Sequence, residues 1–154
     1  MSIRNLLVLL HIVTSVSMAH ASCWSEASAR YNVEVTLLKS LAGQESRGNP
    51  KAVGPKLKSG DRALGLMQIN TVHLPLLRKY GIEQDHLFDA CTSVMLGAWV
   101  MSDCIAKKGA VWAAVACYYA GPNARPTRDQ LNYVQSVQRH YAGYKTQESQ
   151  ETNQ

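Results

Sequence analysis

Hydrophobic residues recur along this chain at helical spacing, and no alternating run is long enough to predict a strand. A short helix is predicted over residues 23–31. The spacing predicts a second helix over residues 35–45, with Asn32 as a plausible N-cap. A Gly-Asn-Pro sequence ends that helix, and the polar stretch over residues 51–63 is expected to be a loop.

The second half of the chain also predicts helices. They are expected over residues 72–80, 91–106 and 111–120, and from a Thr127–Gln130 capping box to Tyr141. Asp89 can cap the helix over 91–106, which is apolar on nearly every side and is therefore expected to be buried. Residues 145–154 hold no apolar side chain and are expected to be a disordered tail. The pattern predicts a compact all-α domain with long loops.

Residues 1–21 have the pattern of a secretory signal peptide. Arg4 precedes an apolar run, and an Ala-x-Ala sequence supplies the small residues that a signal peptidase needs. Cleavage would leave residues 22–144 as one domain followed by the tail. An uncleaved anchor is a weaker alternative because polar residues interrupt the run, and lipidation at Cys23 is weaker still. We therefore expect export to the periplasm.

Composition and charge narrow the class of protein. The chain has 154 residues, of which 46% are hydrophobic and 18% charged, so a disordered chain is excluded. With 10 glycines, 5 prolines and no heptad run, it is neither collagen-like nor a coiled coil. The net charge of +5 is mild and fits an anionic partner. Basic residues are dispersed, so nucleic acid is not an expected partner.

The sequence shows no pattern for a metal site, a phosphate-binding loop or a nucleophilic triad. Beyond the predicted signal peptide, His73, His86 and His140 are scattered and are expected at the surface. Neither of the two glycine-rich phosphate-binding patterns occurs. We therefore expect no metal and no cofactor.

Four cysteines remain after cleavage, and an even number in an oxidising compartment predicts two disulfides. Metal ligation is a weaker alternative, because no Cys-x-x-Cys occurs. Cys91 and Cys104 cannot pair, because one helix would hold their Cα atoms about 20 Å apart and a bridge needs about 7 Å. A chain reversal at Gly109 matches Cys117 better with Cys104 than with Cys91. We therefore favour Cys104–Cys117, which leaves Cys23–Cys91 to tie the N-terminus to the core.

One carboxylate lies where an acid catalyst is plausible. Leu38, Leu41 and Glu45 share the apolar face of the predicted helix over 35–45. Loss of hydration there disfavours the charged form of Glu45 and raises its pKa, and the negative end of the helix dipole acts in the same direction. General acid catalysis needs an acid that is protonated near neutral pH. The plainer alternative is an exposed glutamate at a fraying helix end.

Two further segments combine polar or aromatic side chains with apolar ones. Gln68 and Asn70 occur in a Gly-Leu-Met-Gln-Ile-Asn sequence, which predicts a tight, partly buried loop that presents an amide. Tyr118 and Tyr119 lie at a predicted helix end, where aromatic rings can stack on sugars. The plainer interpretations are a packing turn and ordinary core or surface tyrosines.

In their order along the chain, these segments resemble the lytic transglycosylase domain of the SLT type, which is similar to goose lysozyme. The matching motifs are Glu45-Ser46, Ser59-x-x-x-Ala63-x-Gly65-Leu66-Met67-Gln68-Ile69-Asn70, Tyr118-x-Ala120-Gly121 and Tyr133-Val134. The resemblance spans nearly the whole mature chain and implies a compact lysozyme-like helical fold. The short length, Cys23-Trp24 and Gly97-Ala98-Trp99 look most like small exported enzymes of type III and type IV secretion, conjugation and pilus assembly.

The resemblance implies a cell-wall enzyme whose single catalytic acid is Glu45. Substrate-binding roles are implied for Ser59, Met67, Gln68, Tyr118 and Tyr119, and supporting roles for Ser46, Asn70 and Tyr133. The resemblance also implies the Cys23–Cys91 bridge. The implied partners of a monomeric enzyme are peptidoglycan glycan strands and components of a type III or type IV secretion or pilus apparatus.

Departures from the family pattern leave the reaction open. Tyr119 stands where Asn is usual and Cys117 where Ala is usual, and Ala63 occupies a position that is often Asp, with Asp61 nearby. Hydrolysis of the ordinary type needs two carboxylates. A lone Glu45 therefore favours a lytic transglycosylase that forms a 1,6-anhydro product between N-acetylmuramic acid and N-acetylglucosamine. The alternatives are a muramidase that hydrolyses the same bond with Glu45 and Asp61, and a non-catalytic helical module that binds glycan or membrane.

Overall fold

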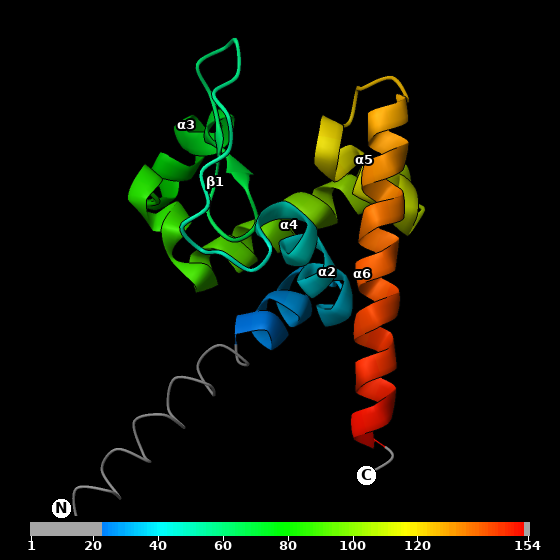
Figure 1. The fold of residues 1–154 in the computed structure, drawn as a ribbon. Helices are drawn as coiled ribbons and strands as arrows, with labels where there is room; N and C mark the ends of the chain where they lie inside the picture. The colour runs from blue at the N-terminus through cyan, green and yellow to red at the C-terminus, as the bar shows by residue number, and fades with distance from the viewer. Residues whose placement is uncertain (1–22, 153–154) are drawn as a thin grey trace, which may run out of the picture.

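The computed structural model describes residues 23–152, which form a mainly helical chain (Figure 1). Its helices are residues 23–31, α2 (Val35–Ser46), α3 (Leu74–Leu77), α4 (Ala90–Lys108), α5 (Val111–Ala120) and α6 (Arg128–Thr152). The other elements of this part of the chain are the 3-10 helices η1 (Thr71–His73), η2 (Arg78–Tyr80) and η3 (Gln84–Phe88) and the two-residue strands β1 (Ala63–Leu64) and β2 (Ile69–Asn70). The predicted all-α class is confirmed.

Helix α4 forms the centre of the core, as its apolar sequence predicts. Val94, Ala98 and Met101 on α4 are fully buried. Asp89 caps the helix by accepting a hydrogen bond from the Thr92 N–H at 2.8 Å, which confirms the predicted cap. Helix α4 packs against α5, and α2 packs against α6. The two helix pairs are joined where α5 packs against α6 and where α2 contacts α4.

Two predicted helix caps differ from the structure. Asn32 has a positive φ of 53° and lies in the turn before α2, so Glu34 is the N-cap residue instead. Thr127 accepts a hydrogen bond from the Gln130 N–H at 3.2 Å, as a capping box requires. The Gln130 side chain does not complete the box, because its amide donates to the Ala116 carbonyl on α5 at 2.9 Å. The Gln130 side chain thus joins α6 to α5 instead of completing the cap at Thr127.

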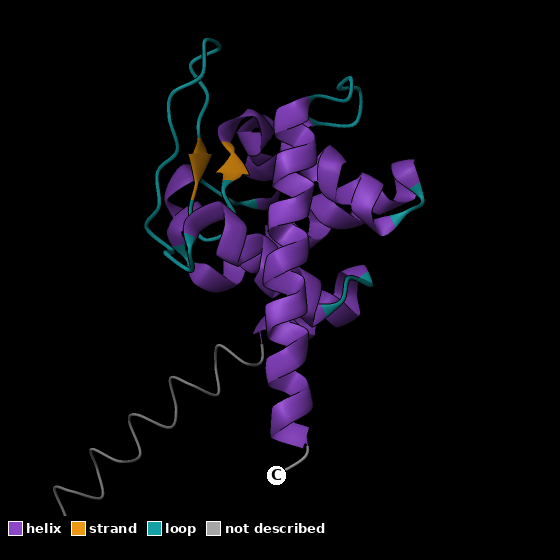
Figure 2. Cartoon of the chain, turned by 45° about the vertical axis from the view of Figure 1, so that its right-hand side comes forward, coloured by secondary structure: helices purple, strands orange, loops and turns teal. Residues whose placement is uncertain are grey.

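Helix α6 continues through residues that the sequence predicts to be disordered, so that prediction is wrong for residues 145–152 (Figure 2). The Lys145 ammonium pairs with Glu34 at 2.9 Å, and the Thr36 hydroxyl donates to the Glu148 carboxylate at 2.7 Å. Polar contacts with the start of α2 therefore hold the last part of α6, residues 145–152, which has no apolar residues of its own. Residues 153–154 and the predicted signal peptide lie outside the described residues.

The loop before β1 forms a narrow hairpin that rises above the helices (Figure 1). Strands β1 and β2 pair antiparallel, and Val53 forms a further antiparallel bridge with Leu64. Closer to the tip, the Leu57 N–H donates to the Asp61 carbonyl at 2.7 Å. The loop predicted over residues 51–63 is therefore ordered by its own backbone hydrogen bonds.

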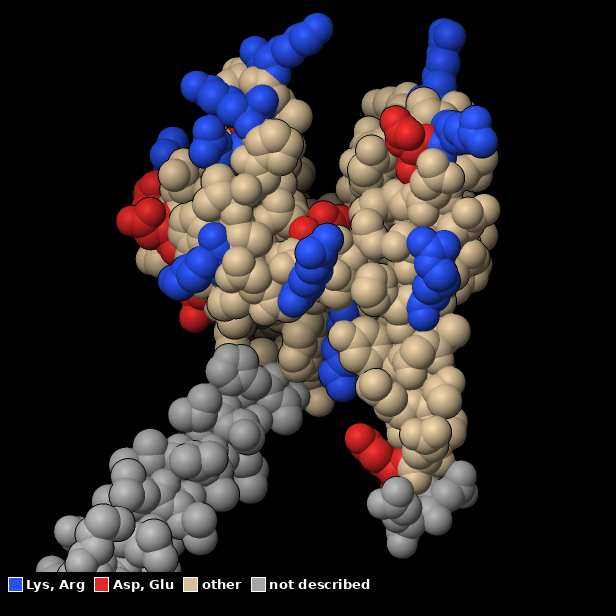
Figure 3. All heavy atoms as spheres, viewed as in Figure 1, with Lys and Arg blue, Asp and Glu red and all other residues tan. Residues whose placement is uncertain are grey.

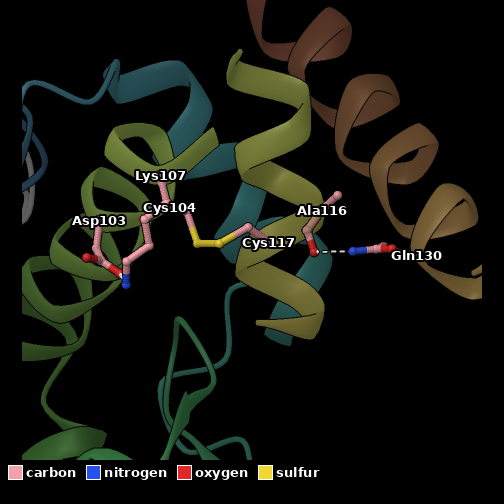
Figure 4. The surroundings of a disulfide bond; sticks show 6 residues. All are labelled: Asp103, Cys104, Lys107, Ala116, Cys117 and Gln130. Carbon is pink, nitrogen blue, oxygen red and sulfur yellow. Dashed lines mark hydrogen bonds and ion pairs between the residues drawn. A yellow bond between two sulfur atoms is a disulfide. The ribbon is translucent and has the colours of Figure 1, made fainter. Parts of the chain in front are cut away.

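Both predicted disulfides are present. Cys23 and Cys91 join the first helix to α4, with Cα atoms 5.4 Å apart. Cys104 and Cys117 join α4 to α5, with Cα atoms 5.7 Å apart (Figure 4). The second bridge lies beside the hydrogen bond that joins α5 to α6 (Figure 4). Helix α5 is therefore fixed on both sides, by a covalent bond and by a hydrogen bond.

The surface is hollowed between two lobes, with acidic atoms at the floor of the hollow and Lys and Arg side chains at the tips of both lobes (Figure 3). The hairpin and α3 form one lobe, and α5 with the start of α6 forms the other (Figure 1). Across residues 23–152, no helix combines the length and the apolar character needed to cross a bilayer.

Candidate active site

Glu45 lies in the last turn of α2, after the buried Leu38 and Leu41 on the same face, as the spacing predicts. Burial raises the pKa of Glu45 to about 7, although a hydrogen bond from Tyr133 acts in the opposite direction. Desolvation therefore outweighs the hydrogen bond, because the carboxyl group is partly shielded from water. A large fraction of Glu45 is protonated at neutral pH.

Two tyrosine hydroxyl groups lie close to the Glu45 carboxyl group. Tyr133 on α6 donates a hydrogen bond to Glu45 Oε1. Tyr118 on α5 donates to the Met67 carbonyl at 2.8 Å. Burial raises the pKa of both phenols, and the charge of Glu45 raises both further. Both hydroxyl groups therefore remain hydrogen-bond donors.

Tyr119 extends this aromatic cluster toward solvent. Its ring stacks on that of Tyr133, with centroids 4.7 Å apart and an interplanar angle of 27°. The Tyr119 residue is 48% exposed, whereas Tyr133 is buried. Tyr119, which stands where the family usually has Asn, therefore restrains the ring of Tyr133, the residue that donates a hydrogen bond to Glu45.

The Glu-Ser pair of α2 is joined to the loop between β1 and β2. The Ser46 hydroxyl donates to the Leu66 carbonyl at 2.7 Å. Gly65 has a φ of +79°, and a Cβ there would overlap the Leu87 carbonyl oxygen, so only glycine fits this turn. The Gln68 side-chain amide donates to the Gly65 carbonyl at 3.0 Å, which fixes the same turn. The two most specific motifs are therefore in direct contact.

Met67 does not line a groove, in contrast to the role that its motif implies. Its side chain is fully buried and packs against Gly97 of α4. Its N–H donates to the Ser93 hydroxyl at 3.0 Å, and its carbonyl accepts the Tyr118 hydroxyl. Met67 positions Tyr118 from the core. Ser93 is not among the residues predicted from the sequence, although a serine on an otherwise apolar helix face is a signal that could identify it.

Three other residues named from the sequence form no hydrogen bond or ion pair with Glu45 in the described part of the chain. Ser59 is exposed at the hairpin tip. The Asp61 carboxylate accepts the Thr71 hydroxyl at 3.0 Å and forms no hydrogen bond or ion pair with Glu45. The Asn70 side chain caps η1. These residues belong to the hairpin lobe, and their substrate roles remain predictions.

The arrangement suits proton transfer by one acid. A carboxyl group with a pKa near neutral can donate a proton and then accept one. Among residues 23–152, no group of three or more His, Cys, Asp and Glu side chains has the arrangement of a metal site. The chemistry that this geometry offers is therefore general acid–base catalysis by Glu45.

Comparison with known proteins identifies a matching family and several relatives. The transglycosylase SLT domain matches residues 22–141. Invasion protein IagB of Salmonella typhi is 36% identical over 140 residues, which cover 90% of this chain and 87% of the relative. Protein IpgF of Shigella flexneri is 34% identical over 125 residues, which cover 80% of this chain and 82% of the relative.

A solved structure has the same fold. It is an inactive mutant of the lytic transglycosylase Slt from Pseudomonas aeruginosa, which superimposes with a TM-score of 0.68 at 22% sequence identity. The match covers 86% of this chain and 25% of the larger one. This likeness confirms the predicted lysozyme-like helical fold, and this chain spans about a quarter of that protein.

Proposed function

The chain belongs to the transglycosylase SLT domain family and is therefore a peptidoglycan lytic transglycosylase, and we propose that Glu45 is its single catalytic acid. The substrate bond is the β-1,4 linkage between N-acetylmuramic acid and N-acetylglucosamine. The observation that carries this proposal is the partly buried position of Glu45, hydrogen-bonded to Tyr133, where burial raises its pKa to about 7. Such an acid holds its proton until a substrate oxygen can take it.

The reaction proceeds in two proton transfers through the same carboxyl group. Glu45 gives its proton to the glycosidic oxygen, and the bond between that oxygen and the muramoyl anomeric carbon breaks. The 2-acetamido carbonyl of the substrate stabilises the cationic carbon. The Glu45 carboxylate then takes the proton of the muramoyl 6-hydroxyl as this oxygen bonds to the anomeric carbon. The product is a 1,6-anhydro sugar, and Glu45 is protonated again.

The tyrosines around Glu45 support both transfers. The Tyr133 hydroxyl donates to the carboxyl group and favours its charged form, which helps the first proton to leave. Tyr118 ties α5 to the loop behind the acid. The exposed ring of Tyr119 is a surface on which a sugar can stack.

A family that acts on peptidoglycan works in the periplasm or outside the cell. For this chain we propose export by cleavage of residues 1–21 and action in the periplasm as a monomer. One relative is named an invasion protein, which supports a role in opening the wall locally for a secretion, conjugation or pilus apparatus.

Product analysis tests the reaction. The mature protein, residues 22–154, is incubated with purified peptidoglycan, and the released muropeptides are identified by mass. We expect 1,6-anhydro-muramoyl ends, lighter by one water than reducing ends. Reducing ends would overturn the lytic route and favour a muramidase that uses Glu45 and Asp61.

Two variants separate these outcomes. Glu45→Gln should keep the circular dichroism spectrum and lose nearly all turnover, whereas Asp61→Asn should retain turnover. Loss of activity in both variants would indicate two carboxylates. Binding to cell wall with no released product from the wild type would favour a non-catalytic module.

A further inference from the structure

A second concavity lies against the face of α2 that points away from Glu45. It has a volume of about 510 Å³, is open to solvent and is lined mainly by α2, α6 and the helix over residues 23–31. The residues that give it its character are Trp24, Lys39, Gly43, Arg47, His140 and Tyr144. Ligand pockets have volumes of roughly 300–1,000 Å³, so this one can hold a small ligand or a peptide segment.

The spacing of these residues explains why the pocket is separate from the acid. Lys39 and Gly43 lie four residues apart on one face of α2, and Arg47, the C-cap residue of the helix, follows after the same interval. Glu45 lies midway between Gly43 and Arg47 in sequence and points to the opposite side. The ring of His140 lies over Gly43, where an added Cβ would come within 3.2 Å of His140 Nδ1. Glycine at position 43 therefore lets α6 approach α2 and gives the pocket its floor.

The pocket carries positive charge that no lining residue neutralises. Lys39 and Arg47 line it, and its lining contains no Asp or Glu. Within residues 23–152, neither Lys39 nor Arg47 forms an ion pair. Glu148 is near enough for Lys39 to lower its pKa, but its carboxylate already bonds to Thr36 and Lys145. Two cations beside Trp24 and Tyr144 fit an anionic group on a partly apolar body.

We propose that this pocket binds a carboxylate of the peptide stem that peptidoglycan carries on its muramoyl sugar. The stem has free carboxylates and alanine methyl groups, which match the cations and the aromatic walls. Arg47 follows Glu45 by two residues, and Leu66, which lines the pocket, is bonded through its carbonyl to Ser46. The pocket therefore adjoins the C-terminal end of α2, around which a stem on a sugar at Glu45 would pass to reach it. The proposal rests on the proposed function.

One wall of the pocket extends beyond the matched domain. The family match ends at residue 141, and Tyr144 on the continuation of α6 lies beyond it. The charged contacts of Lys145 and Glu148 with the start of α2 hold this continuation against the domain. The part of α6 outside the family match therefore contributes Tyr144 to the wall of the pocket.

Binding of the free stem tests the pocket directly. The tetrapeptide L-Ala–γ-D-Glu–meso-diaminopimelate–D-Ala is titrated into the mature protein by calorimetry, and a form with amidated carboxylates serves as the ligand control. We expect Lys39→Ala/Arg47→Asn to weaken binding at least tenfold, with Asn chosen because Arg47 has a left-handed φ of 54° that Asn tolerates. Lys79→Ala/Arg139→Ala removes the same charge elsewhere and should leave binding unchanged. If the amidated peptide binds the wild-type protein as tightly as the free tetrapeptide does, the proposal is wrong, whatever the variants show.

Turnover on two substrates tests the consequence. The variant Lys39→Ala/Arg47→Asn should be about tenfold slower on intact peptidoglycan and unchanged on glycan strands freed of peptides by an amidase. Equal losses on both substrates would contradict a stem site. Tighter binding of an acidic peptide of ordinary protein sequence than of the tetrapeptide would assign the pocket to a protein partner instead.

The two proposals fail separately. Glu45→Gln should bind the tetrapeptide with the wild-type affinity while losing turnover on both substrates. Retained turnover in Glu45→Gln would contradict the assigned acid and leave the measured stem binding intact. Absence of stem binding in an active wild type would contradict the pocket alone.

Discussion

Glu45 is held between two opposed influences on its pKa. Burial at the end of α2 disfavours the carboxylate, and the Tyr133 hydroxyl favours it by donating a hydrogen bond. Burial is the larger effect, and the pKa rises from the ordinary 4.5 to about 7. One side chain therefore accounts both for acid chemistry at neutral pH and for a dependence of stability on pH.

Replacing Glu45 with glutamine should stabilise the protein at alkaline pH. The folded pKa of about 7 lies above 4.5, so the folded state binds this proton more tightly than the unfolded chain does. The contribution of Glu45 to stability is most favourable below 4.5 and declines as pH rises to about 7. We expect Glu45→Gln to exceed the wild type by about 3 kcal/mol at about pH 8 and to match it near pH 4. Urea unfolding at the two pH values measures the difference, and a gap independent of pH would contradict the raised pKa.

Removing the Tyr133 hydroxyl should move the pH profile of activity upward. Tyr133→Phe loses the hydrogen bond that lowers the pKa of Glu45, so that pKa rises above 7. The alkaline limb of kcat/KM should shift to higher pH, and the maximal rate should fall because the carboxylate formed during reaction is less stable. Tyr141→Phe is the control, since its hydroxyl bonds to the remote Glu34 at 2.7 Å. An unshifted alkaline limb in Tyr133→Phe would show that another group controls the profile.

At the scale of elements, local periodicity predicts α4 and α5 well, whereas it predicts the cap of α2 and the end of α6 poorly. The apolar spacing placed α4 and α5 to within two residues of their observed bounds. The expected disorder after residue 144 failed because Lys145 and Glu148 find partners on α2. The Asn32 cap failed because the chain needs a left-handed turn at that position. Both wrong predictions depend on how distant segments of the chain approach each other. The local sequence carries no information about that approach.

The packing of α4 against the loop between β1 and β2 predicts a cost for one added methyl group. A Cβ at Gly97 would lie 2.6 Å from Met67 Cε and 2.9 Å from Met67 Cγ. Gly97→Ala should destabilise the protein by about 1–3 kcal/mol. It should also lower turnover, because the displaced Met67 carbonyl holds Tyr118.

A matched glycine separates this effect from helix propensity. Gly143 on α6 has no atom within 4 Å of an added Cβ, so Gly143→Ala should gain about 0.5–1 kcal/mol. Thermal unfolding of both variants and turnover on peptidoglycan provide the comparison. Stabilisation by Gly97→Ala would contradict the close packing.

At the scale of the molecule, the sequence predicts the burial of Glu45 better than it predicts the contacts of the candidate site. Glu45 and its burial followed from spacing along one helix. Its hydrogen bond to Tyr133 joins α2 to α6, and such a contact between distant segments has no local signal. For Met67 the motif predicts a side chain that lines the glycan groove, but the side chain is buried in the core. The pocket behind α2 had a signal that was not used, the interval of four between Lys39, Gly43 and Arg47.

The two disulfides should contribute unequally to the stability of the whole molecule. Cys23–Cys91 closes a separation of 68 residues, and Cys104–Cys117 closes 13. On the chain-entropy model, the longer loop gives about 4 kcal/mol and the shorter about 3 kcal/mol. The paired Ser variants of each bridge should therefore differ in urea unfolding by about 1 kcal/mol, with the loss of Cys23–Cys91 the more damaging.

Turnover should respond in the opposite order. Cys104–Cys117 fixes α5, which carries Tyr118 beside the acid, whereas Cys23–Cys91 fixes the first helix, which forms a wall of the pocket behind α2. Loss of Cys104–Cys117 should slow cleavage of bare glycan strands, and loss of Cys23–Cys91 should spare it while weakening binding of the peptide stem. Equal effects of both variants on bare strands would show that the helices hold the site without covalent help. If the two variants differ in this way, Cys104–Cys117 contributes less to stability than Cys23–Cys91 but holds Tyr118 in position beside Glu45.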